Sequence, residues 1–150
     1  MSNNIYPSWW DQTITVFNKY EDPTTREITW YKTALSNCFW KYTENKITMG
    51  DTSLESSVTL CRVPINAVFK EKYEWDALKP AVRSNFFTFA PGDIIVRGSV
   101  NDTVSEYTPG SRSSDLLKKY KKLQGCMVVE QCSINTGGGR GSEHYLVKGL

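Results

Sequence analysis

The chain has 150 residues, a length that fits one domain and lets a single hydrophobic core form without disulfides or metals. Its formal net charge of +2 is too small for a dedicated nucleic-acid binder. The start has no signal-peptide pattern, and no stretch approaches the roughly 18 apolar residues that a membrane helix needs. We therefore expect a protein made in a cytoplasm, away from membranes, with its four cysteines reduced.

The first half of the chain has the short alternating runs of apolar and β-branched residues that are typical of strands. These runs predict strands at residues 13–17, 27–31, 37–42 and 58–63. Asp22 ahead of Pro23 favours a type I turn, so the first two strands should form a hairpin.

A polar stretch, Thr43–Ser57, separates the third strand from the fourth. Its apolar residues are few, and Gly50-Asp51 lies in its middle. We expect a long hairpin tip or loop of low local stability.

In the second half, residues 65–89 have no clear period beyond one helical turn near Trp75–Lys79. One convincing helix follows, at about 111–123, with an apolar stripe at helical spacing and lysines in its last turn. Strands are expected at residues 93–100, 126–134 and 143–147, and a glycine-rich loop at 136–141. The chain should therefore be mainly β, a small β-barrel or sandwich forming one domain over 1–150, with one short helix and a long polar loop.

No residue pattern predicts catalysis. His144 is the single histidine, and it lies in an alternating strand without the base and orienting partner that catalysis requires, so a structural role is favoured. The thiols are spaced unlike zinc ligands and fall in predicted strands, which favours core packing; they are Cys38, Cys61, Cys126 and Cys132. We expect no enzyme activity, no metal and no cofactor.

Two further clusters have a structural and a functional interpretation. The run 137–141 lacks the lysine and the following helix of a phosphate-binding loop, so a hairpin loop is favoured. The helix carries a basic cluster that suits a solvated face but could also contact DNA phosphate or a partner. Its members are Lys118, Lys119, Lys121 and Lys122.

Aromatic residues suggest a subunit interface. Trp9 and Trp10 lie in a polar start that no periodic core pattern covers, and exposed tryptophans are typical of interface centres. We consider subunit contact and packing within the chain equally for Trp9, Trp10, Phe39 and Trp40.

The order of several motifs resembles the minor-capsid and head-closure proteins of tailed bacteriophages. The matching segments are Val16–Tyr20, Thr29–Leu35, Cys38–Trp40, Cys61–Pro64, Pro91–Gly98, and Asn135–Gly141 followed by Glu143–Gly149. Together these segments cover most of the chain. The lysine-rich stretch Ser105–Gln124 departs from the pattern.

The resemblance implies a structural β-barrel in a homo-oligomeric ring, on the order of six or twelve copies, at the neck of the virion. An adaptor or portal protein would lie above the ring and a tail terminator or tail tube below, and double-stranded DNA would pass without being read. In the stopper members of the family, loops from the ring narrow the channel. We expect the polar stretch to do this here, through Glu44, Asn45, Lys46, Asp51, Thr52 and Glu55.

Two other functions stay open. A tail terminator or another tail-joining protein would differ in position but not in chemistry. A small nucleic-acid-binding barrel of the OB type would need surface aromatics alternating with Lys or Arg on its central strands. Lys41 and Arg62 are the only basic residues of the third and fourth predicted strands.

Overall fold

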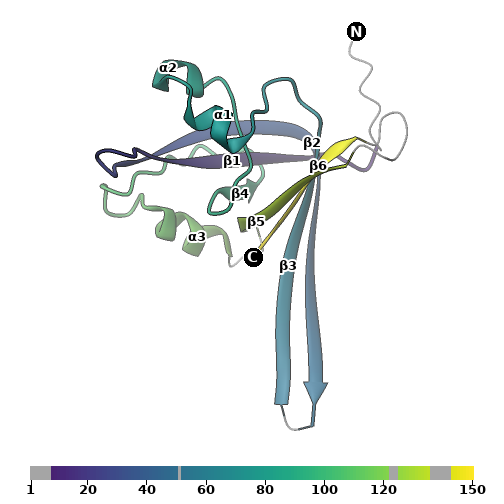
Figure 1. Cartoon of the computed structure of the whole chain (residues 1–150). Helices are drawn as coiled ribbons and strands as arrows, with labels where there is room; N and C mark the ends of the chain where they lie inside the picture. The colour runs from purple at the N-terminus through teal and green to yellow at the C-terminus, as the bar shows by residue number, and fades with distance from the viewer. Residues whose placement is uncertain (1–7, 51, 122–124, 136–142) are drawn as a thin grey trace.

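Six antiparallel strands form a closed β-barrel, to which three short helices are attached (Figure 1). The computed structural model describes residues 8–50, 52–121, 125–135 and 143–150, and for 44–49 and 52–57 it describes the backbone alone. Within that part of the chain the strands are β1 (Gln12–Glu21), β2 (Ile28–Met49), β3 (Thr52–Pro64), β4 (Ile94–Arg97), β5 (Cys126–Asn135) and β6 (His144–Gly149).

The barrel closes in the order β1-β2-β3-β6-β5-β4, and β4 then pairs with β1. The 22-residue strand β2 takes part in two ladders: its first half pairs with β1 and its second half with β3. The change of partner lies at Asn37 and Cys38, where Asn37 has a φ of 60° and the register with β1 shifts. Asparagine tolerates this left-handed conformation, and such a bulge bends the strand away from its first partner.

The barrel interior holds the main core, and a second apolar layer lies outside it. Ile14 and Val16 face the interior, whereas Phe17 packs with Ile94 and Val96 in the outer layer. Helix α3 (Ser113–Lys121) covers this outer layer through Leu116. Residues of β1 and β4 are therefore buried on both faces, which explains their nearly continuous apolar runs.

Two short helices, α1 (Lys72–Asp76) and α2 (Pro80–Arg83), are held against β1 and β2 by a buried cation. The guanidinium of Arg83 donates hydrogen bonds to the carbonyls of Trp75, Asp76 and Leu78 and lies 3.6 Å from the ring centroid of Tyr20. Because carbonyl oxygens and an aromatic face stabilise the charge, Arg83 can be buried at this position.

The structure confirms the mainly β fold and identifies it as a barrel. Helix α3 lies within the predicted range, and Asp22 forms the predicted turn by accepting hydrogen bonds from the amides of Thr24 and Thr25. These two bonds lower the pKa of the Asp22 carboxyl.

Three expectations need correction. The runs predicted as separate strands at 27–31 and 37–42 are one strand, β2, because the bulge bends the chain without ending its pairing. The helical turn near Trp75–Lys79 is two helices, α1 and α2, divided at Pro80. The stretch 43–57 is paired strand up to Met49 and from Thr52 onward, so the hairpin alternative is confirmed and the long polar loop is wrong. The predicted loop at 136–141 lies outside the described residues.

Candidate functional site

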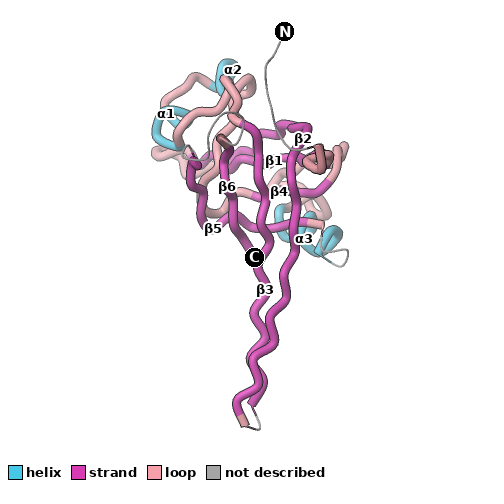
Figure 2. Tube along the Cα trace, turned by 90° about the vertical axis from the view of Figure 1, so that its right-hand side faces the viewer, coloured by secondary structure: helices cyan, strands magenta, loops and turns pink. Residues whose placement is uncertain are grey.

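The most unusual feature of the molecule is a two-stranded ribbon that extends from the barrel (Figures 1 and 2). Beyond Thr59 and Tyr42, and among the residues that the structure describes, β2 and β3 pair only with each other, from Thr43↔Val58 to Met49↔Thr52. We call these residues, 43–49 and 52–58, the arm. At about 3.3 Å per residue the arm reaches roughly 20 Å past the barrel.

The backbone register gives the arm two faces of different composition. Cys38 and Trp40 of β2 face the barrel core, and strand alternation continues this face through positions 44, 46 and 48. The register pairs these positions with 57, 55 and 53, so this face carries only polar and charged residue types: Glu44, Lys46, Thr48, Ser53, Glu55 and Ser57. The opposite face carries the pair Ile47↔Leu54 together with Met49 and Val58.

Five of the six residues predicted to line a channel belong to this arm. Glu44, Lys46 and Glu55 fall at positions of the polar face, and Asn45 and Thr52 at positions of the other face. Asp51 lies outside the described residues. The prediction identified the segment correctly as distinct but missed its strand conformation.

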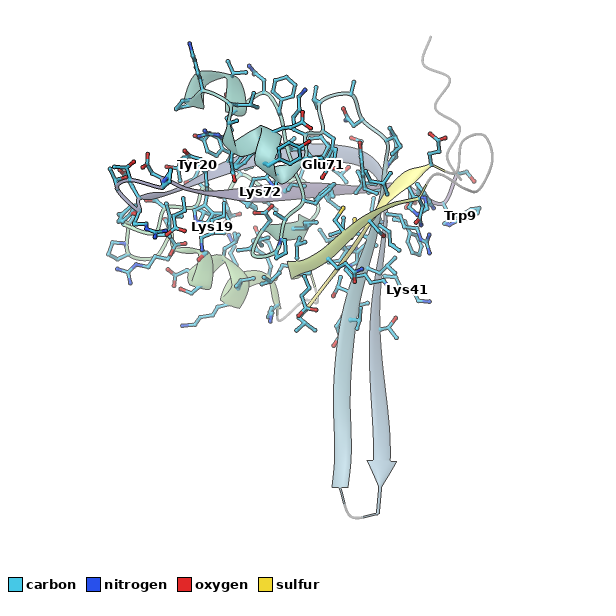
Figure 3. The ribbon with its side chains drawn as sticks, viewed as in Figure 1. Trp9, Lys19, Tyr20, Lys41, Glu71 and Lys72 are labelled. Atoms are coloured by element: carbon cyan, nitrogen blue, oxygen red, sulfur yellow. The ribbon has the colours of Figure 1, made fainter. Side chains whose placement is uncertain are left out.

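At the base of the arm, the outer face of β2 and β3 is hollowed into a depression of about 370 Å³. We call it the Trp9 depression, and its lining residues are Trp9, Trp10, Phe39, Lys41, Leu60 and Arg62. Trp9 is 64% exposed, and Lys41 is exposed beside it. Figure 3 shows both residues on the same side of the barrel.

Three of the four aromatic residues predicted at a subunit interface surround this depression. Trp9 and Phe39 are accessible, and Trp10 is largely buried beneath them. Trp40 lies in the barrel core and cannot reach a neighbouring subunit, because it alternates to the opposite face from Phe39.

His144 supports the floor of the Trp9 depression. Arg62 Nη1 donates to His144 Nε2 over 3.0 Å, and Asn135 Nδ2 lies 3.1 Å from the same nitrogen. The ring of Trp10 meets the imidazole edge-on at 5.4 Å. These contacts connect His144 to Arg62, Asn135 and Trp10, beside the Trp9 depression.

The four lysines of the predicted cluster have different surroundings in the structure. Lys119 forms a 2.8 Å ion pair with Asp102, which also accepts a hydrogen bond from Tyr120. These contacts lower the pKa of the Asp102 carboxyl. Lys118 and Lys121 are exposed on α3, and Lys122 lies outside the described residues.

The cysteines occupy the predicted strands as free thiols. Cys38 and Cys61 are fully buried in the core. Burial raises the pKa of Cys61, and it raises the pKa of Cys132 to about 12. Within residues 8–50, 52–121, 125–135 and 143–150, no group of three or more His, Cys, Asp and Glu could hold a metal ion.

One buried acid was missed from the sequence. Asp93 accepts hydrogen bonds from the side chain of Asn18 and from the backbone amides of Lys19 and Ala90, and it thereby links β1 to the turn before β4. Burial raises its pKa to about 6, although these bonds oppose the shift. An acid between a Pro-Gly turn and a β-branched run was the available signal, because such an acid commonly binds nearby amides.

The chain belongs to a family whose model matches residues 9–150 and which is described as a family of unknown function, DUF6751. No curated protein and no solved structure matches the chain significantly. In the part of the chain that the structure describes, none of the helices has the length and apolar character needed to cross a bilayer.

Proposed function

We propose that the chain is a structural subunit of the head–tail connector of a tailed bacteriophage, in the head-closure or stopper position. It would assemble in the cytoplasm of the bacterial host and remain in the neck of the virion. The ordered motifs that resemble the head-closure proteins support this proposal, and so does a closed barrel with a long projecting arm.

The arm is the observation that carries the proposal. A closed barrel leaves few unpaired strand edges, whereas an isolated two-stranded ribbon is marginally stable in water. The arm has no neighbouring strand among the described residues beyond Tyr42 and Thr59. Neighbouring copies in a ring would supply the missing support, and the arms would then lie toward the common axis.

The composition of the arm fits a channel through which DNA slides. The stretch 43–57 contains three acidic residues, Glu44, Asp51 and Glu55, and one basic residue, Lys46. A mostly acidic lining repels phosphates over about 8–10 Å at physiological salt, so DNA would pass without adhering. The arm positions that carry Ile47 and Leu54 would contact adjacent arms in the ring.

A shortened arm tests the proposal. Replacing residues 45–56 by Asn-Gly joins the register pair Glu44↔Ser57 through a two-residue turn and leaves the barrel strands unchanged. In phage particles we expect rings to form but packaged DNA to leak, as measured by the nuclease-protected DNA per particle. A matched control, Glu44→Gln with Glu55→Gln, keeps the arm length and should retain DNA. Full DNA retention by the shortened variant would count against a gate.

A nucleic-acid-binding barrel is the second candidate, and the Trp9 depression favours it. Phe39 alternates with Lys41 on β2, and Arg62 lies across from Phe39 on β3. Such an arrangement suits bases that stack beside a phosphate backbone. Titration with a single-stranded oligonucleotide tests this candidate: the connector proposal expects no salt-dependent binding, and micromolar binding that Lys41→Glu abolishes would favour the alternative.

A further inference from the structure

A second, chemically opposite surface lies on α1. Tyr73 is 74% exposed, and Glu71 and Glu74 are exposed beside it. The negative charges of Glu74 and Glu71 raise the pKa of Tyr73. We call Glu71, Tyr73 and Glu74 the α1 knob.

The positive charge of α1 is used within its own chain, so the knob is left acidic. Lys72 donates to the Lys19 carbonyl, pairs with Asp76 at 3.1 Å and lies over the ring of Trp75. Trp75 is fully buried. The cation of α1 is thus held within its own chain, and the outer surface presents two carboxylates and a tyrosine.

The Trp9 depression has the complementary properties. Its aromatic walls are Trp9 and Phe39, and Lys41 and Arg62 supply positive charge. Trp, Tyr and Arg are the residues that most often dominate binding energy at interfaces, and opposite charges fix the partner and its register. A depression with aromatic walls, an exposed tryptophan and two cations is therefore suited to receive a tyrosine between two acids.

We propose that the Trp9 depression of one chain receives the α1 knob of a second copy of this chain. Trp9 and Lys41 lie apart from Glu71 in Figure 3, on a different face of the molecule. A contact between two different faces is head-to-tail, and repeated head-to-tail contacts close into a ring when the rotation allows. This proposal rests on the proposed function, since it specifies the faces by which the connector ring would assemble.

Charge reversal on purified full-length chain tests the pairing. Sedimentation up to millimolar concentration should show self-association of the wild-type protein. Lys41→Glu alone and Glu74→Lys alone should each weaken this association at least tenfold, because each places like charges together. The double variant Lys41→Glu/Glu74→Lys restores opposite charges and should recover most of the association.

Two further variants separate this contact from a general charge effect. Lys118→Glu makes the same charge change on exposed α3 and should leave association unchanged. Tyr73→Ala removes the centre of the knob and should weaken association at least tenfold. Both residues are exposed, so the circular dichroism spectrum and melting temperature should stay those of the wild type.

Several results would overturn the proposal. They are a wild-type chain that stays monomeric at millimolar concentration, single reversals without effect, and a double variant that does not recover. Oligonucleotide binding at Trp9 that Lys41→Glu abolishes would assign the depression to nucleic acid instead. If these variants exclude the contact between knob and depression but the protein is still found in the virion neck, the pairing is wrong and the proposed function stands.

Discussion

The strands β2 and β3 run through two regions of the molecule that differ in what stabilises them. In the barrel, Trp40 and Cys61 form a cross-strand pair inside the main core, and β3 has β6 as its other neighbour. In the arm, as far as the structure describes the chain, the same two strands pair with each other alone. Most of the stability of a sheet comes from packing of its faces, so the barrel should fold alone, whereas the arm should depend on the molecules around it.

The largest expected difference between the two regions concerns Phe87. Its side chain is fully buried in the barrel core, where it packs edge-on against Phe69 and Phe89. Phe87→Ala should lower the free energy of unfolding by about 3–5 kcal/mol, from lost transfer energy and a cavity. Urea denaturation measures this loss.

The arm supplies the matched comparison. Replacing residues 45–56 by Asn-Gly should change the free energy of unfolding by less than about 0.5 kcal/mol, because it alters no buried contact of the barrel. If the shortened variant lost as much stability as Phe87→Ala, the arm would be part of the cooperative unit and the contrast between the regions would fail.

The next effect concerns the seam where β1 meets β4 and closes the barrel. The pKa of Asp93 is about 6 in the folded chain, above its usual 3.8, so the folded chain keeps this proton at pH values where the unfolded chain has lost it. The stabilisation that comes from protonated Asp93 is complete below about pH 4, falls as the pH rises and is lost above about pH 6. The change amounts to about 3 kcal/mol.

Carboxyl titration by carbon NMR gives the direct measurement, with an expected midpoint for Asp93 near pH 6. Asp93→Asn should remove the corresponding fall from the pH dependence of stability. Asp22 and Asp102, whose pKa values are lowered, contribute in the opposite sense and serve as internal references. A midpoint near the usual value for Asp93 would show that the seam is hydrated.

Two glycines, one in the barrel and one in the arm, should show the smallest difference in stability between the two regions. A Cβ at Gly149 of β6 would meet the backbone carbonyl of Val128, so Gly149→Ala should cost about 1–3 kcal/mol by forcing the barrel strands apart. Gly50, at the end of the arm, has a φ of +63° with open space around it. Gly50→Ala should strain only the arm and leave global unfolding within about 0.5 kcal/mol, as measured by urea denaturation. Equal losses at both positions would contradict the distinction.

The parts of the fold that sequence patterns predicted are those in which local chemistry and burial agree. The Asp22-Pro23 turn and α3 are examples. The turn has the side-chain hydrogen bonds of Asp22, and α3 has an apolar stripe and basic residues in its last turn. The free thiols also lie in the strands predicted for them.

The parts that were missed depend on distant contacts. A polar composition suggested a loop for the arm, but cross-strand pairing of β2 with β3 overrides weak local preferences. Arg83 has a charged side chain that normally indicates exposure, and its burial depends on carbonyls and rings that only the fold assembles. The depression likewise joins Trp9 to residues of two later strands, which no spacing in the sequence indicates.

Cryo-electron microscopy of intact virions tests the central claim most directly. We expect a ring of this chain in the neck, between the portal region and the tail, with the arms directed at the channel. Absence of the chain from mature particles, or a position outside the neck, would contradict it.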